Sequence, residues 1–295
     1  MKKLIVVFVV LMLVCASSVM AGLITLNKPG ATKTLPYGIS GSNIVGWYTG
    51  SSGSHGFLYN GTSWTNLDMP GANATYPYGM SGNNIIGFYY DASTDSSHGF
   101  LYNGMNWSAL NFPGATDTHA YGISGNNIVG WYGDASGQHS FLYDGATWST
   151  LSVPGATYTE AHGVSDNNIV GWYSDVFGDT HGFLYDGATW TTLNFPGTTA
   201  FTEALGISGN KIVGWCDTGS SSPAFLYDGT NWTTFNATGA WYTEAYGIFG
   251  NNIVGWYSNS SGNHGFTYTV PEPSTIALLM GGVATFVLSR FRRKK

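Results

Sequence analysis

Three short segments in the second half of the chain place an aromatic ring beside a carboxylate. They read YTE at residues 158–160, FTE at 201–203 and YTE at 242–244. Aromatic faces stack on sugar rings, and carboxylate oxygens accept hydrogen bonds from hydroxyl groups or bind Ca²⁺. We therefore expect a half-ring that binds a glycan or a divalent cation. Its candidate residues are Tyr158, Glu160, Phe201, Glu203, Trp241, Tyr242 and Glu244. The competing interpretation is that each glutamate only solvates a turn, since charged residues are mostly exposed.

Glycoside hydrolysis is the rival chemistry for the same carboxylates. A glycosidase needs two carboxyl groups about 5 to 10 Å apart, and Glu160, Glu203 and Glu244 could supply such a pair. General acid catalysis also needs one carboxyl group with a raised pKa, and the sequence does not mark one. The chain has no nucleophile elbow, phosphate-binding loop or close-spaced metal motif. We therefore expect a non-enzymatic protein without a resident cofactor, Ca²⁺ being the one ion considered, and keep a glycan hydrolase or lyase as the alternative.

A sixfold internal repeat must position these residues. The segment YGISGSNIVGWY and its later copies carry a marker glycine, spaced by 41 or 43 residues, at Gly38, Gly79, Gly122, Gly163, Gly206 and Gly247. This period is typical of a β-propeller blade. Each unit divides into four short β-prone pieces. The loop between the second and third pieces carries nearly all the length differences, so we expect it to be exposed.

The two ends of the repeat region complement each other. Residues 23–32, LITLNKPGAT, resemble the closing part of a unit, such as WSALNFPGAT from Trp107, whereas the sixth unit lacks its fourth piece. We therefore predict an all-β fold: a six-bladed β-propeller of four-stranded blades over residues 22–269, with the last blade closed by the N-terminal strand. Such closure removes the exposed sheet edge. An open solenoid is the alternative, but it would need capping repeats.

Histidine and tryptophan recur with the same period. A ring of metal-binding histidines is disfavoured, because packed sheets lie about 10 Å apart and zinc–ligand bonds are about 2 Å long. We expect the histidines to make structural hydrogen bonds and the tryptophans to pack the blades together rather than to bind sugars. The residues are His55, His98, His139, His181 and His264 in the third piece, Trp47, Trp131, Trp172, Trp215 and Trp256 in the second, and Trp64, Trp107, Trp148, Trp190 and Trp232 in the fourth.

Both ends of the chain predict export. Lys2 and Lys3 precede an apolar run, and Ala21 ends a small-residue cleavage site, so residues 1–21 are interpreted as a signal peptide, with lipidation at Cys15 as the alternative. Residues 276–288 form an apolar stretch, which is shorter than the roughly 20 residues of a comfortable membrane span. We expect a short transmembrane helix there, with its basic tail in the cytoplasm and the body of the chain outside. The tail residues are Arg290, Arg292, Arg293, Lys294 and Lys295.

The body between these ends is acidic. Residues 22–270 contain fifteen aspartates and glutamates against three cations, Lys28, Lys33 and Lys211, so their net charge is about −12. Nucleic acid is excluded as a partner, because phosphate binding needs clustered Lys and Arg. Cys216 is the one cysteine left after export, so the body can form no internal disulfide.

Two resemblances to known families follow from these motifs. From Val270 the chain reads VPEPSTIALLMGGVATFVLSRFRRKK, which resembles the PEP-CTERM sorting signal of exported bacterial proteins. That resemblance implies an exosortase that recognises Pro271, Glu272 and Pro273, cuts nearby and releases or transfers the protein, commonly in bacteria that make extracellular polysaccharide. An ordinary tail anchor is the alternative. The repeats, with GIS…N.IVG followed by H.FLY..G, resemble the extracellular HAF-type repeat family, which implies an extracellular repeat domain and no particular activity.

The sequence therefore predicts three parts: a signal peptide at residues 1–21, a propeller at 22–269 and a sorting signal at 270–295. We expect an exported protein, first anchored in the membrane and then located at the cell surface or in the extracellular matrix. Its propeller would bind extracellular polysaccharide or serve a purely structural role.

Overall fold

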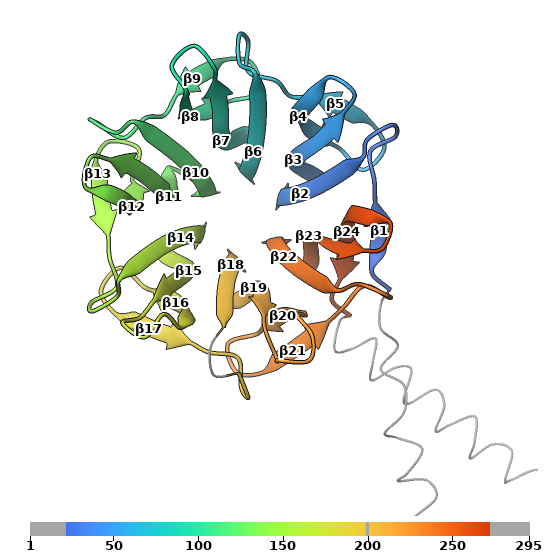
Figure 1. Cartoon of the computed structure of the whole chain (residues 1–295), viewed down its shortest axis with the longest axis vertical. Helices are drawn as coiled ribbons and strands as arrows, with labels where there is room; N and C mark the ends of the chain where they lie inside the picture. Colours follow the sequence, from blue (N-terminus) through green and yellow to red (C-terminus); the bar gives the residue numbers. More distant parts are fainter. Residues whose placement is uncertain (1–21, 199–200, 272–295) are drawn as a thin grey trace, which may run out of the picture. The chain divides into compact units, whose positions relative to one another are not determined.

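Alternating apolar and polar residues, with a turn every eight to ten residues, produce short antiparallel strands throughout the repeat region. The computed structural model describes residues 22–198 and 201–271. By internal contacts the chain divides into two units, one of residues 24–267 and one of the two chain ends. The first unit consists of six four-stranded antiparallel sheets arranged as the blades of a ring (Figure 1). The predicted six-bladed β-propeller is confirmed.

Each blade begins with a strand at the centre of the ring and ends with a short strand at its outer edge (Figure 1). The inner strands are β2 (Lys33–Ser40), β6 (Ala74–Ser81), β10 (Asp117–Ser124), β14 (Tyr158–Ser165), β18 (Thr202–Ser208) and β22 (Tyr242–Phe249). The second strands are β3 (Asn43–Gly50), β7 (Asn84–Asp91), β11 (Asn127–Asp134), β15 (Asn168–Ser174), β19 (Lys211–Cys216) and β23 (Asn252–Asn259). The third strands are β4 (Gly53–Tyr59), β8 (Ser96–Tyr102), β12 (Gly137–Tyr143), β16 (Thr180–Tyr185), β20 (Ala224–Tyr227) and β24 (Gly262–Thr269). The outer strands are β5 (Trp64–Asn66), β9 (Trp107–Ala109), β13 (Trp148–Leu151), β17 (Trp190–Leu193), β21 (Trp232–Phe235) and β1 (Ile24–Leu26).

The sixth blade is built from both ends of the repeat region, in the order β1-β24-β23-β22. Ile24 is paired with Thr267, and Leu26 with Gly265. The N-terminal strand thus supplies the missing fourth piece, as predicted. Blades are numbered 1 to 6 from β2 to β22.

The marker glycines let neighbouring inner strands approach closely. A Cβ atom on Gly38 would lie 2.7 Å from the carbonyl oxygen of Tyr78 in the next blade, and one on Gly247 would lie 2.5 Å from the carbonyl oxygen of Tyr37. The second contact joins blade 6 to blade 1, so the same approach is repeated around the full ring. A larger residue at these positions would separate adjacent blades.

The core is made of equivalent residues from every blade. Each third strand contributes a fully buried phenylalanine, namely Phe57, Phe100, Phe141, Phe183, Phe225 or Phe266. Full burial of such a side chain contributes about 1.5–3 kcal/mol relative to exposure. Residues of adjacent blades share these clusters, as Val129 of blade 3 does with Phe183 of blade 4. Apolar contacts between adjacent blades therefore stabilise the ring.

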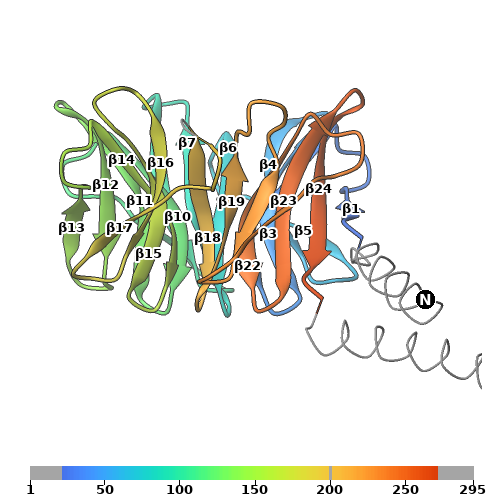
Figure 2. The same cartoon turned by 90° about the horizontal axis from the view of Figure 1, so that it is seen from below.

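The ring has two rims with different connections (Figure 2). The rim that we call the loop rim carries the loops between second and third strands and the starts of the inner strands. The opposite rim, the turn rim, carries the tight turns between first and second strands. The loop of blade 4 between β15 and β16 is exposed, as predicted for this variable loop.

The predicted signal peptide, transmembrane helix and basic tail lie outside the described residues, as do Glu272 and Pro273. Residues 22–198 and 201–271 contain no helix of the length and hydrophobicity needed to cross a bilayer.

Candidate functional site

Three layers of side chains from the inner strands surround the axis of the ring. The layer nearest the loop rim consists of Leu35, Tyr76, His119, Glu160, Glu203 and Glu244, one from each blade. The middle layer consists of Tyr37, Tyr78, Tyr121, His162, Leu205 and Tyr246, and the layer nearest the turn rim of Ile39, Met80, Ile123, Val164, Ile207 and Ile248. The three carboxylates therefore belong to neighbouring blades 4, 5 and 6, on one side of the channel.

Aromatic rings of the middle layer close the channel. The ring centroids of Tyr37 and Tyr78 are 4.2 Å apart, and those of Tyr37 and Tyr246 are 4.5 Å apart. Tyr121 stacks on His162 at 4.6 Å. The middle and turn-rim layers line an open cavity, which the carboxylates do not line. The carboxylates are thus at the loop-rim end of the channel.

A repeated hydrogen bond of a threonine side chain holds the start of each inner strand. The threonine ahead of the marker glycine is buried, and its Oγ accepts a backbone N–H from the segment that leaves the preceding outer strand. Thr159 accepts from Val153 at 3.1 Å, and Thr243 accepts from Ala237 at 3.2 Å. These bonds fix the residues on either side of each threonine, which include the candidate aromatics and glutamates. The three glutamates lie within the inner strands; Tyr158 and Tyr242 are the first residues of β14 and β22, whereas Phe201 and Trp241 immediately precede β18 and β22.

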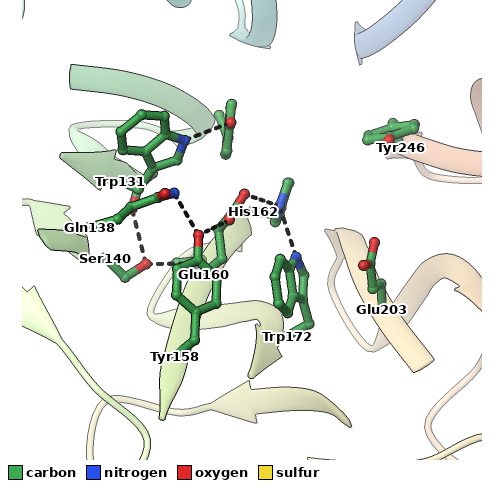
Figure 3. A network of polar contacts seen from close by, with 12 residues as sticks. Trp131, Gln138, Ser140, Tyr158, Glu160, His162, Trp172, Glu203 and Tyr246 are labelled. Atoms are coloured by element: carbon green, nitrogen blue, oxygen red, sulfur yellow. Dashed lines mark hydrogen bonds and ion pairs between the residues drawn. The ribbon is translucent and has the colours of Figure 1, made fainter. Parts of the chain in front are cut away.

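Glu160 lies in a network of hydrogen bonds with neighbouring side chains (Figure 3). Its Oε1 is 2.9 Å from Nε2 of His162, and Tyr158 donates its hydroxyl proton to Oε2. Burial alone would raise the pKa of the carboxyl group, but the bonds to His162 and Tyr158, with the charge of His162, hold it below its usual value. Glu160 therefore stays ionised, at only 8% exposure.

Glu203 has fewer compensating contacts. Nε1 of Trp215, on the next strand of the same blade, donates to its Oε2 at 2.8 Å. Burial raises the pKa of Glu203 and the charge of Glu160 raises it further, while the charge of His162 and the Trp215 bond oppose that effect; the result is a raised pKa. Figure 3 shows Glu203, His162 and Tyr246 turned toward one another from three neighbouring inner strands.

Glu244 is the carboxyl group that is hardest to ionise. It accepts the hydroxyl proton of Tyr246 at 2.7 Å. Burial and the nearby charge of Glu203 raise its pKa to about 7, although the Tyr246 bond acts against them. Because Glu244 turns to Tyr246, Nε1 of Trp256 is buried without a partner among the described residues.

The aromatic candidates differ in how much of their surface is available. Tyr158 packs on Trp172 at 5.0 Å, Phe201 on Trp215 at 4.4 Å, and Tyr242 edge-on to Trp256 at 5.4 Å. Trp241 is 64% exposed. Trp241 is therefore the candidate aromatic with a face free for a ligand.

The repeated tryptophans divide into two roles. Those of the outer strands pack within their own blade, as Trp64 does on Phe57 and Tyr59 at 4.9 and 4.6 Å. Those of the second strands wall the carboxylate site, where Trp215 donates to Glu203 and Nε1 of Trp172 lies 3.3 Å from Nε2 of His162. The predicted packing role therefore fits the first set, whereas the second set also takes part in the site's polar network.

Four of the five repeated histidines of the third blade strands, His55, His139, His181 and His264, make structural hydrogen bonds, as expected, whereas His98 packs against the ring of Tyr89. His55 contacts Ser52 at 2.8 Å and Asp68 at 3.0 Å, so it ties two connections together. His264 contacts Ser261 and Asn27 in the same way. Among the described residues, no group of three or more His, Cys, Asp or Glu side chains is arranged to hold a metal ion.

Sequence reasoning missed two features of this rim. His162, which connects Glu160 to Trp172, could have been found from the aromatic or imidazole residue that precedes most marker glycines. Val176 and Phe177, in the loop between β15 and β16, are 70% and 87% exposed. A comparison of the six variable loops would have revealed this pair, because the other five loops contain no two adjacent bulky apolar residues.

Comparisons with known proteins agree with the fold and with the C-terminal signal. Residues 269–294 match the PEP-CTERM protein-sorting motif. No curated protein sequence matches the chain significantly. The HAF-type resemblance stays a prediction.

Solved structures that match this chain include several propellers. The β-propeller domain of the Trilobed protease from Pyrococcus furiosus, described as having an open velcro topology, matches with a TM-score of 0.52 and 8% identity over 86% of this chain and 94% of that chain. A triple mutant of AofleA from Arthrobotrys oligospora matches with a TM-score of 0.54 and 14% identity over 82% and 86%. TolB from Acinetobacter baumannii matches with a TM-score of 0.53 and 14% identity over 79% and 66%. At these identities the likeness concerns the fold alone.

Proposed function

We propose that this chain is an exported, exosortase-sorted surface protein whose propeller binds polysaccharide, without catalysis, at the loop rim of blades 4 to 6. The observation that carries the proposal is a break in the sixfold repeat. Blades 4, 5 and 6 place Glu160, Glu203 and Glu244 in the loop-rim layer, where the other three blades have Leu35, Tyr76 and His119. A feature confined to half of a repeated ring is not needed to build the ring, so we assign it to binding.

The chemistry of this half-ring suits hydroxyl groups. Each carboxylate group makes one or two hydrogen bonds with protein side chains and retains acceptor capacity for further hydrogen bonds. Trp241, which is 64% exposed and immediately precedes the strand of Glu244, supplies aromatic surface at this end of the half-ring. The PEP-CTERM match implies export through an exosortase-type system, with membrane anchoring before processing. An extracellular location brings the rim into contact with secreted polymers.

Native affinity electrophoresis of the purified full-length chain tests the proposal. The gels contain laminarin, galactomannan or arabinan at physiological salt. We expect at least one polymer to retard the wild type and the Glu203→Ala/Glu244→Ala variant to lose that retardation. The matched control is Asp68→Ala, because Asp68 is a half-exposed carboxylate on the connection between blades 1 and 2. Near-UV circular dichroism verifies that each variant is folded.

Two results would overturn the proposal. If no polysaccharide from this panel or from the producer's own matrix retards the wild type, the propeller has a structural role. If the double variant and the wild type are retarded equally, binding occurs elsewhere on the molecule.

Glycan hydrolysis is the second candidate, and one observation favours it. The pKa of Glu160 is lowered while that of Glu244 is raised to about 7. In glycosidases the two catalytic carboxyl groups differ in the same way, since one stays ionised and the other keeps its proton and acts as the general acid. Release of reducing sugar from the retained polymer by the wild type, and its loss in Glu244→Gln, would identify an enzyme. We expect no release.

A further inference from the structure

The loop between β15 and β16 presents the most exposed large apolar side chain of the described residues. Phe177 is 87% exposed and Val176 is 70% exposed. Both lie at the loop rim of blade 4, the rim that carries the three carboxylates. Single exposed apolar residues are common on protein surfaces, so exposure alone does not assign them a role.

Asp175 holds this loop in one shape. Its Oδ1 accepts the backbone N–H groups of Phe177 at 2.8 Å and Asp179 at 3.0 Å, and its Oδ2 is 3.3 Å from Nε2 of His181. The backbone N–H of Asp175 donates to the carbonyl of Asp179 at 3.0 Å, which closes the loop. Gly178 supplies the positive φ of +89° that the loop needs. Phe177 is therefore fixed in an outward position before any ligand binds, which lowers the entropy cost of binding.

Trp241 is the second exposed aromatic at this rim. It is 64% exposed and lies on the connection from blade 5 to blade 6, immediately before β22. Blade 5 lies between the two aromatic residues (Figure 1). Because packed sheets are about 10 Å apart, one sugar ring cannot cover both. A ligand that uses both must extend along the rim.

The charge of this region selects against ionic polymers. Glu160, Glu203, Glu244, Asp175 and Asp179 lie toward the loop rim of blades 4 to 6, and the one cation of these blades, Lys211, begins β19 at the opposite rim. Anionic glycans, nucleic acid and anionic lipid would be repelled. Since the carboxylates already accept protein donors, their remaining acceptor capacity suits hydroxyl groups better than it suits a cation.

We infer that the ligand is an extended, uncharged polysaccharide chain that runs along the loop rim from blade 4 to blade 6, stacked on Phe177 at one end and on Trp241 at the other. This inference rests on the proposed function and specifies its ligand. Glu203 and Glu244, which keep part of their surface exposed, accept hydroxyl hydrogen bonds from the intervening sugar units.

Isothermal titration of the full-length chain with laminari-, manno- and arabino-oligosaccharides of two to eight units tests the inference. We expect affinity to rise with length in the series that the rim recognises. Phe177→Ala and Trp241→Ala should each weaken binding of the longest oligomer about five- to tenfold, since aromatic anchors dominate such contacts. Phe177→Tyr should bind normally. The matched control is Met105→Ala, because Met105 is equally exposed, at 82%, in a hairpin turn of blade 2 at the opposite rim.

The outcomes separate this inference from the proposed function. If Phe177→Ala binds the longest oligomer like the wild type while Glu203→Ala/Glu244→Ala does not, the rim binds glycan but Phe177 is no platform, and the inference is wrong. An affinity independent of length also contradicts it. Preference for chitosan, with a steep loss of affinity in salt, would show a cationic ligand. If Phe177→Ala instead reduces binding to phosphatidylcholine vesicles and leaves oligosaccharide affinity intact, the loop contacts membranes. If the wild type binds no oligomer but a polysaccharide retards it in the gels, this inference alone fails; if neither occurs, both proposals fail.

Discussion

Replacing Glu244 by glutamine should stabilise the protein at alkaline pH. The pKa of this buried carboxyl group rises from its ordinary 4.5 to about 7, because it is desolvated and lies near the charge of Glu203. One pKa unit corresponds to about 1.4 kcal/mol, so ionised Glu244 costs the folded state about 3 kcal/mol. Glutamine keeps an acceptor for the Tyr246 hydroxyl and carries no charge.

The sign of the pH dependence follows from proton uptake. Between pH 4.5 and about 7 the folded protein keeps a proton on Glu244 that the unfolded chain has lost, so wild-type stability falls as the pH rises through this window. Glu244→Gln lacks this loss. We expect the two proteins to have equal free energies of unfolding at pH 4 and the variant to be more stable by about 3 kcal/mol at pH 8.

Urea denaturation of the full-length wild type and variant, followed by near-UV circular dichroism from pH 4 to 8, measures the difference. Glu160→Gln is the control, because this substitution is expected to lower the free energy of unfolding instead of raising it. Since the pKa of Glu160 is lowered, its ionised form stabilises the fold. That variant should be less stable at pH 7, and the deficit should disappear as the pH falls below the ordinary 4.5. Equal stability of Glu244→Gln and wild type at pH 8 would refute the reasoning.

Three further predictions concern the ring itself. Thr159→Val should lower the free energy of unfolding by about 1–3 kcal/mol, because the buried N–H of Val153 loses its acceptor; urea denaturation measures this loss. Gly206→Ala should lower the melting temperature, since its Cβ would lie 2.3 Å from the carbonyl oxygen of Tyr246 in the next blade. Leu26→Pro should speed hydrogen exchange in β24, because Leu26 is paired with Gly265 and its counterparts in other blades, Leu67 and Leu110, donate their N–H groups to the equivalent glycines, a bond that proline cannot make.

The fold could be predicted from the sequence because it depends on local patterns that repeat. The spacing of the marker glycines predicted the number of blades. The N-terminal segment around Thr25, which resembles the fourth strand of a unit, predicted how the ring closes. Both follow from steric needs that every unit shares: a glycine where inner strands meet, and a partner for the open edge of β24. The burial of the carboxylates could not be predicted, because it depends on where each inner strand begins.

That starting point depends on a side-chain hydrogen bond that strand patterning does not reveal. The threonine hydroxyl in each unit accepts a backbone N–H from six or seven residues earlier, and the residue after the threonine, a glutamate in blades 4 to 6, then lies within the inner strand. Nor does sequence distinguish Glu160 from Glu244. Burial raises the pKa of both carboxyl groups; the hydrogen bonds and charge of His162, with the bond from Tyr158, reverse that shift for Glu160, whereas the charge of Glu203 adds to it for Glu244. Phe177 was visible in the sequence only as part of the one apolar pair that the six variable loops contain.

Hydrogen–deuterium exchange of the full-length chain, with and without the polysaccharide that retards it most, tests the central claim directly. The ring contains its own control, because blades 1 to 3 repeat the same segments without the carboxylates. The account predicts slower exchange with ligand at residues 155–160, 175–179 and 239–244, and no change at the equivalent residues 30–35, 71–76 and 114–119. Equal protection of both halves, or protection confined to the turn rim, would contradict it.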